Sequence, residues 1–195
     1  MKTTRRDATM TIFDHNGLVT SQILIVPLLL FFALLVISDV RHHRLKLVRV
    51  LFQAVLCVYL WAVFDMTLFP INISRNIGTL AASGYTFQGA IDVHPLAMWY
   101  NWRQPTVLYQ LVGNGLMLLP LTLLCGGLSA KLRPFWRAIG LAFGTSLFIE
   151  TSQLIMNYFN FGERTFDLND LLLNSLGGLL GWILLKVGLA IWQRT

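Results

Sequence analysis

Charged residues are scarce in this chain. Asp, Glu, Lys and Arg make up only 12% of its 195 residues, whereas soluble domains carry about 25%. Hydrophobic residues make up 55% of the sequence, and its mean hydropathy is +0.63. This composition argues against an ordinary soluble domain and predicts a polytopic membrane protein, whose length suits one compact bundle.

Cysteine is also rare, and common catalytic motifs are absent. The two cysteines, Cys57 and Cys125, both lie in apolar runs, so we expect buried, inert thiols rather than a disulfide or metal framework. The sequence contains no HExxH, GxSxG or P-loop motif, which are the signatures of zinc proteases, serine hydrolases and nucleotide-binding enzymes. Neither an internal repeat nor a low-complexity tract is visible.

Long apolar segments, by contrast, are abundant. Spanning a bilayer as a helix takes about 20 residues, and five segments meet this requirement: 18–38, 47–69, 106–128, 136–156 and 168–190. The first is too long for the core of a signal peptide and lacks a small-residue cleavage site, so we expect a retained helix. The sequence predicts an all-α, polytopic membrane helix bundle with about five transmembrane helices.

The basic residues predict the orientation of this bundle in the cell (plasma) membrane. Positive charge is favoured on the cytoplasmic side. One end carries nine basic residues: Arg41, Arg44, Lys46, Arg49, Lys131, Arg133, Arg137, Lys186 and Arg194. The other end carries six: Lys2, Arg5, Arg6, Arg75, Arg103 and Arg164. We therefore predict an outside N-terminus and a cytoplasmic C-terminus. The net charge of +6 is attributed to this topology and to anionic lipid headgroups rather than to nucleic acid.

Polar residues are concentrated between residues 150 and 181, within or beside apolar helices. A carboxylate inside a membrane helix costs about 2.5–3.5 kcal/mol on insertion scales, so its presence indicates a functional site. Spacings of i, i+3 and i+7 place three side chains on one face of a helix. This spacing occurs twice: Glu150, Gln153 and Asn157, then Asp167, Asp170 and Asn174.

This pattern resembles the VanZ-like family of bacterial membrane proteins. The residues that carry the resemblance are Glu150 with Gln153, then Arg164, Asp167, Asp170 and Asn174, then Gly177, Gly178 and Gly181. The chain also resembles the family pattern at Ile91 to Leu96, Asn114 and Pro120. It departs from that pattern where Glu163 separates Gly162 from Arg164. The resemblance covers about residues 48–190. It divides the chain into an N-terminal tail with an extra transmembrane helix (1–47) and a VanZ-like membrane domain (48–195).

With the predicted topology, the polar residues converge in the outer leaflet. We predict a ligand-binding or functional polar cluster, with the arginine paired to an acid. Its members are Glu150, Gln153, Arg164, Asp167, Asp170, Asn174 and Asn114. The structural alternative is a network that locks the turn, with Asp167 or Asn169 capping the last helix. The glycines at 177, 178 and 181 indicate close helix packing.

The resemblance also implies a function. Members of the family are associated with resistance to the lipoglycopeptide teicoplanin, so this chain is expected to lower susceptibility to such antibiotics at the outer face without destroying them. The expected partners are membrane lipids, with a lipid-linked cell-wall precursor or the lipoglycopeptide as ligand. We predict neither a cofactor nor a catalytic residue, and the sequence leaves the oligomeric state open.

Two other classes of function remain as alternatives. In a membrane enzyme acting on a phospholipid or polyprenyl-linked lipid, Glu150 would be the general base and Arg164 the phosphate clamp. Against this, we expect His94 to lie in a distant loop, away from any nucleophile. A small lipid or solute transporter would need a pair of broken helices, whereas Gly113 and Pro120 interrupt only one. A divalent ion on the three acids suits hard oxygen ligands, but we do not predict one.

Overall fold

The computed structural model describes residues 18–72, 90–94, 100, 102–159, 161–162 and 164–193. These ranges contain five helical spans that are long and apolar enough to cross a membrane: Ser21–Arg41, Leu47–Leu68, Pro105–Leu128, Phe135–Tyr158 and Leu168–Trp192. Each lies within one turn of a predicted segment, which confirms the all-α membrane bundle. Several residues discussed above lie outside the described residues: Lys2, Arg5, Arg6, Arg75, Pro95, Leu96, Glu163 and Arg194.

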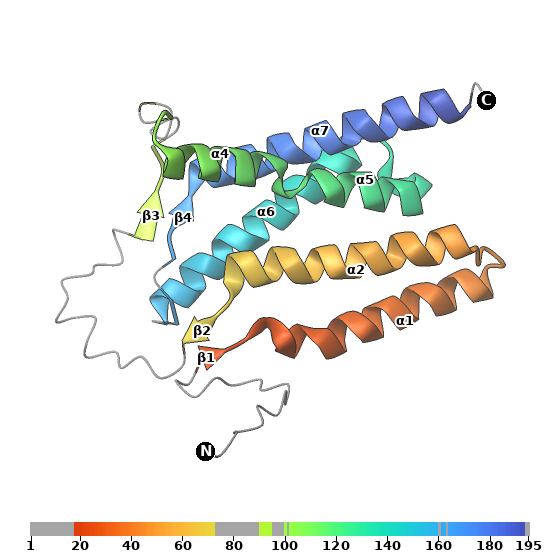
Figure 1. The fold of residues 1–195 in the computed structure, drawn as a ribbon, viewed down its shortest axis with the longest axis horizontal. Helices are drawn as coiled ribbons and strands as arrows, with labels where there is room; N and C mark the ends of the chain where they lie inside the picture. The colour runs from red at the N-terminus through yellow and green to blue at the C-terminus, as the bar shows by residue number, and fades with distance from the viewer. Residues whose placement is uncertain are drawn as a thin grey trace, which may run out of the picture.

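The helices run back and forth between two ends (Figure 1). In chain order they are the 3-10 turn η1 (Ser21–Leu24), α1 (Ile25–Arg41), α2 (Leu47–Leu68), α4 (Pro105–Met117), α5 (Leu119–Leu128), the 3-10 turn η4 (Ala130–Leu132), α6 (Phe135–Tyr158) and α7 (Leu168–Trp192). The short strands of the described residues, β1 to β4, gather at one end, here called the strand end. The α1–α2 turn, the α5–α6 turn and the end of α7 lie at the other, here called the turn end.

Two strand pairs hold connecting segments together at the strand end. β1 (Leu18–Val19) pairs antiparallel with β2 (Ile71–Asn72). The first membrane span therefore begins at Ser21 rather than at residue 18, because Leu18 and Val19 bond to the segment after α2. β3 (Ile91–Asp92) pairs in parallel with β4 (Phe166–Asp167), immediately before α7.

Small residues on α7 allow three other helices to pack closely against it. A Cβ atom on Gly177 would lie 2.7 Å from the Gly115 carbonyl oxygen of α4. A Cβ on Gly178 would collide with Ala142 of α6, and one on Gly181 would collide with the Leu119 carbonyl of α5. The predicted packing role of these glycines is confirmed, and α7 is the helix around which α4, α5 and α6 assemble.

The third span is broken in its middle. Pro120 lies at the start of α5 and has no N–H with which to continue the hydrogen bonds of α4. Leu118, between the two helices, is fully buried. The Tyr59 hydroxyl of α2 donates to the freed carbonyl of Met117 at 2.7 Å, so the broken backbone finds a partner within the protein, as membrane burial requires.

The first helix packs mainly on α2 and ends later than predicted. His43 adopts the left-handed conformation (φ 52°), and the Arg44 amide donates to the Asp39 carbonyl at 2.8 Å, which is a Schellman ending. The helix therefore includes Asp39, which the predicted span of 18–38 left out. Many apolar side chains on the remaining surface of α1 are exposed, such as Val26 and Leu34, both at 64%, as expected for a helix that faces lipid.

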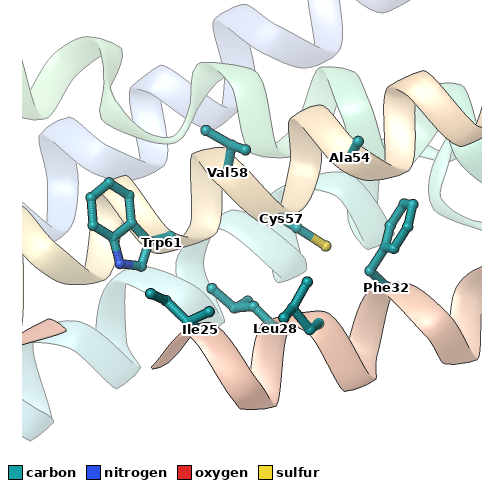
Figure 2. Close-up of a pocket in the computed structure, with 8 residues that line it drawn as sticks. Ile25, Leu28, Phe32, Ala54, Cys57, Val58 and Trp61 are labelled. Carbon is teal, nitrogen blue, oxygen red and sulfur yellow. The ribbon is translucent and has the colours of Figure 1, made fainter. Parts of the chain in front are cut away.

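An apolar groove of about 290 Å³ separates the first two helices. Figure 2 shows side chains from both helices around it. Its lining consists of Ile25, Leu28, Leu29, Phe32, Ala54, Cys57, Val58 and Trp61. Both cysteines are free thiols; Cys57 is buried as expected, whereas Cys125 is only half-buried.

Candidate functional site

The polar cluster forms at the strand end around the start of α7. The Glu150 carboxylate on α6 is only 2% exposed and accepts the backbone amide of Asp167 at 3.0 Å. Asp167 is the N-cap of α7, where its carboxylate accepts the Asn169 amide at 2.7 Å. Of the two caps that the structural alternative named, Asp167 and Asn169, the structure shows Asp167. This arrangement brings Asp167 beside Glu150.

A third acid completes this group. Asp170 lies half-buried in the first turn of α7, and the side-chain amide of Asn114 on α4 donates to it. Asp167 and Asp170 both lie within electrostatic range of Glu150. We call Glu150, Asp167, Asp170 and Asn114 the acid cluster. No Lys, Arg or His side chain forms an ion pair with any of these acids within the described part of the chain, where the ion pairs are Arg49–Asp39 and His94–Asp92.

The predicted ion pair of Arg164 is wrong. Its guanidinium donates to the Phe69 carbonyl at 3.2 Å, and no carboxylate among the described residues lies within ion-pair distance. The backbone carbonyls at the end of α2 lack helical partners, so one of them is available to accept a hydrogen bond from Arg164. Arg164 therefore holds the α6–α7 connection against the end of α2 instead of neutralising the acids.

Two side-chain amides of α6 also donate hydrogen bonds to backbone carbonyls of neighbouring segments. Gln153 donates to the Thr67 carbonyl of α2 at 2.9 Å, and Asn157 donates to the Arg164 carbonyl. Gln153 and Arg164 thus form a second group around the end of α2, beside the acid cluster. Their role in this structure is the interhelical locking that the structural alternative describes.

Asn174 lies one turn deeper on α7 and is 1% exposed. Its amide nitrogen donates to the Ser146 hydroxyl of α6 at 3.0 Å. Its Oδ1 is buried without a hydrogen-bond partner among the described residues. Buried polar atoms are usually paired, so this carbonyl oxygen is an acceptor available to a donor that reaches the core of the bundle.

His94 was expected in a loop distant from any nucleophile, and the structure places the segment that contains it beside the acid cluster. The β3–β4 pair sets Asp92 opposite Asp167, and the Asn169 side chain donates to the His94 carbonyl at 3.1 Å. The His94 ring lies 3.1 Å from the Asp92 carboxylate. The backbone amide and ring of His94 hold the pKa of Asp92 below its ordinary value. The resemblance of residues 91–96 to the family pattern was the one signal that pointed here.

A second polar network, which the sequence did not suggest, lies at the turn end. The Arg49 guanidinium makes a two-fold ion pair with Asp39, at 2.8 and 2.9 Å, and also donates to the Leu128 carbonyl at 3.0 Å. Gln53 donates to the same carboxylate at 2.8 Å. This network joins α1, α2 and α5 and satisfies an acid that is only 5% exposed.

The described residues do not assemble a metal site: no group of three or more His, Cys, Asp or Glu side chains among them is placed to hold an ion. Glu150 comes from the face of α6, whereas Asp167 and Asp170 come from the start of α7. Two of their carboxylate oxygens already accept hydrogen bonds from backbone amides. The arrangement suits a ligand that brings hydrogen-bond donors or positive charge.

Five membrane-spanning helices and a polar cluster at one end define a polytopic membrane protein. The chain belongs to the VanZ/LLP1 family, whose model matches residues 52–190. The match begins within α2 and leaves α1 outside it. Comparisons with curated proteins and with solved structures found no match.

Proposed function

We propose that this protein lowers susceptibility to lipoglycopeptide antibiotics such as teicoplanin through the acid cluster. One observation carries the proposal: Glu150, Asp167 and Asp170 lie together, and no cation among the described residues neutralises them. Removing acids from water without a partner is costly, so a positively charged or donor-rich ligand would be bound with a gain in free energy. The family membership of the chain points to the class of ligand.

The predicted topology places this cluster in the outer leaflet, where a lipoglycopeptide or a lipid-linked cell-wall precursor would reach it. In this proposal the protein binds and does not cleave its ligand. Expression in a susceptible bacterial host is therefore expected to raise the inhibitory concentration of teicoplanin, while the drug is recovered intact from the medium. Unchanged susceptibility, with the protein present in the membrane at a level seen by immunoblotting, would reject the proposal.

The outer location can be tested independently of any drug. In a variant without Cys57 and Cys125, a cysteine replacing Thr165, which is exposed beside β4, should react with an impermeant thiol reagent in intact cells. A cysteine replacing Ala130, which is exposed at the turn end, should react only after the cells are broken. The reverse pattern would place the acid cluster in the cytoplasmic leaflet.

One contact favours a second candidate, a membrane enzyme acting on a phospholipid or polyprenyl-linked lipid. Asp92 and His94 form a carboxylate–imidazole pair beside the start of α7, and such a pair suits general acid–base chemistry. Purified protein in liposomes separates the candidates. An enzyme would convert the lipid and lose this activity in His94→Gln, whereas the binding protein proposed above leaves the lipid unchanged.

A further inference from the structure

Two adjoining cavities at the turn end carry an excess of positive charge. One, of about 360 Å³, lies between the start of α2 and the α5–α6 turn. The other, of about 290 Å³, lies beside the end of α1. The basic side chains that line them are His42, Arg44, Arg49, Lys131 and Arg133, and the two cavities share Arg44, Ser129 and Lys131.

Only some of the basic side chains in these cavities have a hydrogen-bond or ion-pair partner. Arg49 is neutralised by Asp39, and Arg133 donates through Nε to the Gly126 carbonyl at 3.0 Å. The side chains of Arg44 and Lys131 form no hydrogen bond or ion pair among the described residues. Asp39, which also lines the smaller cavity, lies within electrostatic range of Arg44 but is held by Arg49. The shared wall of the two cavities therefore presents two cations that are not engaged in an ion pair, which is the chemistry that binds a phosphate group.

An apolar groove of about 350 Å³ adjoins the larger basic cavity. It lies between α2, α5 and α7 and shares Arg49, Gly127 and Leu128 with that cavity. Its remaining lining is almost wholly apolar: Val48, Phe52, Leu123, Leu184, Leu185, Gly188, Leu189 and Trp192. A soluble phosphate compound has no apolar part to bury in this groove, whereas a lipid acyl chain fits it.

We propose that the turn end binds one anionic phospholipid, with its headgroup phosphate between Arg44 and Lys131 and an acyl chain along the groove. Charge complementarity selects the headgroup, and basic pockets between membrane helices are suited to such lipids. The site lies at the opposite end of the bundle from the acid cluster (Figure 1), so the proposal does not depend on the antibiotic function.

The test uses the purified full-length chain in detergent, with lipid added and the apparent affinity read from the rise in unfolding temperature or from native mass spectrometry. Phosphatidylglycerol is expected to stabilise the protein, whereas phosphatidylcholine has little effect. Inorganic phosphate and glycerol 3-phosphate, which lack acyl chains, are expected to bind far more weakly. Equal effects of the two phospholipids would overturn the headgroup assignment, and binding of free phosphate as tight as that of the lipid would overturn the role of the groove.

Matched variants locate the site. Arg44→Gln with Lys131→Gln is expected to weaken phosphatidylglycerol binding roughly ten- to thirty-fold. Arg41→Gln with Lys46→Gln removes the same charge from the α1–α2 turn without touching the cavity linings and should bind as the wild type does. Equal loss in both double variants would reduce the interaction to general surface charge and overturn the proposal.

A separate variant tests whether an acyl chain occupies the groove. No described atom lies within 4 Å of a Cβ placed on Gly188, so Gly188→Leu extends a side chain into the groove without a clash at its Cβ. Phosphatidylglycerol binding should weaken in this variant while binding of inorganic phosphate stays unchanged. Full retention of lipid binding in Gly188→Leu would show that no acyl chain occupies the groove.

Discussion

Asp39→Ala is expected to lower the free energy of unfolding in detergent by about 3 kcal/mol, the lower part of the 3–5 kcal/mol range for breaking a buried ion pair. The side chain of Asp39 is 8% exposed and that of Arg49 is 28% exposed. Removing the acid leaves the guanidinium with the Leu128 carbonyl as its remaining bond in the network. It also removes the acceptor of the Gln53 amide, so the junction of α1, α2 and α5 loses several contacts at once.

A second variant separates charge from shape at this junction. Replacing both members of a buried pair by apolar residues is often neutral or stabilising, so Asp39→Ala with Arg49→Met should regain a large part of the lost stability. Denaturant titration in a fixed detergent measures both variants. If the double variant unfolds as early as the single one, an unpaired charge is not the cause of the loss.

Gly181→Ala is expected to lower the free energy of unfolding by about 1–3 kcal/mol, the usual cost of overpacking. The added Cβ would collide with the Leu119 carbonyl and the Thr122 hydroxyl. The Leu119 carbonyl belongs to the backbone of α5, so the clash cannot be relieved by a side-chain rotation, and α5 must move away from α7. For a chain of this size the midpoint of thermal unfolding should fall by about 2–4 °C per kcal/mol.

Gly188→Ala is the matched control on the same helix. No described atom lies within 4 Å of its Cβ position, and Ala favours a helix over Gly by about 1 kcal/mol. This variant should therefore unfold at the wild-type temperature or above it. Similar losses in Gly181→Ala and Gly188→Ala would mean that the close approach of α5 is not what Gly181 permits.

The five spans could be predicted from the sequence because each depends on local composition. Runs of about 20 apolar residues have few stable forms other than a membrane helix. The i, i+3 and i+7 spacing of Glu150, Gln153 and Asn157 correctly indicated one helix face, because that spacing depends only on helix geometry. The close packing of the α7 glycines, and a cap at Asp167 or Asn169, could also be predicted because both depend on residue types within a short segment.

Contacts between distant segments could not be predicted in the same way. Arg164 was expected to pair with an acid, yet it binds the Phe69 carbonyl, because its choice of partner depends on how α2 ends. His94 was expected in a loop distant from any nucleophile, and its position at the start of α7 could not be predicted because it depends on the pairing of β3 with β4. The Asp39–Arg49 pair crosses a turn whose geometry depends on the left-handed conformation of His43.

The measurement that most directly tests the central claim is teicoplanin susceptibility of cells expressing Glu150→Gln or Asp170→Asn. Both changes remove charge while keeping an oxygen that can accept from the Asp167 amide or from Asn114. Asp65→Asn, in the last turn of α2, is the matched control, since Asp65 makes no hydrogen bond or ion pair with the acid cluster among the described residues. Our account predicts that all three proteins accumulate normally and that only Glu150→Gln and Asp170→Asn lose protection. Full protection by both at wild-type protein levels would contradict it and leave the acids with a purely structural role.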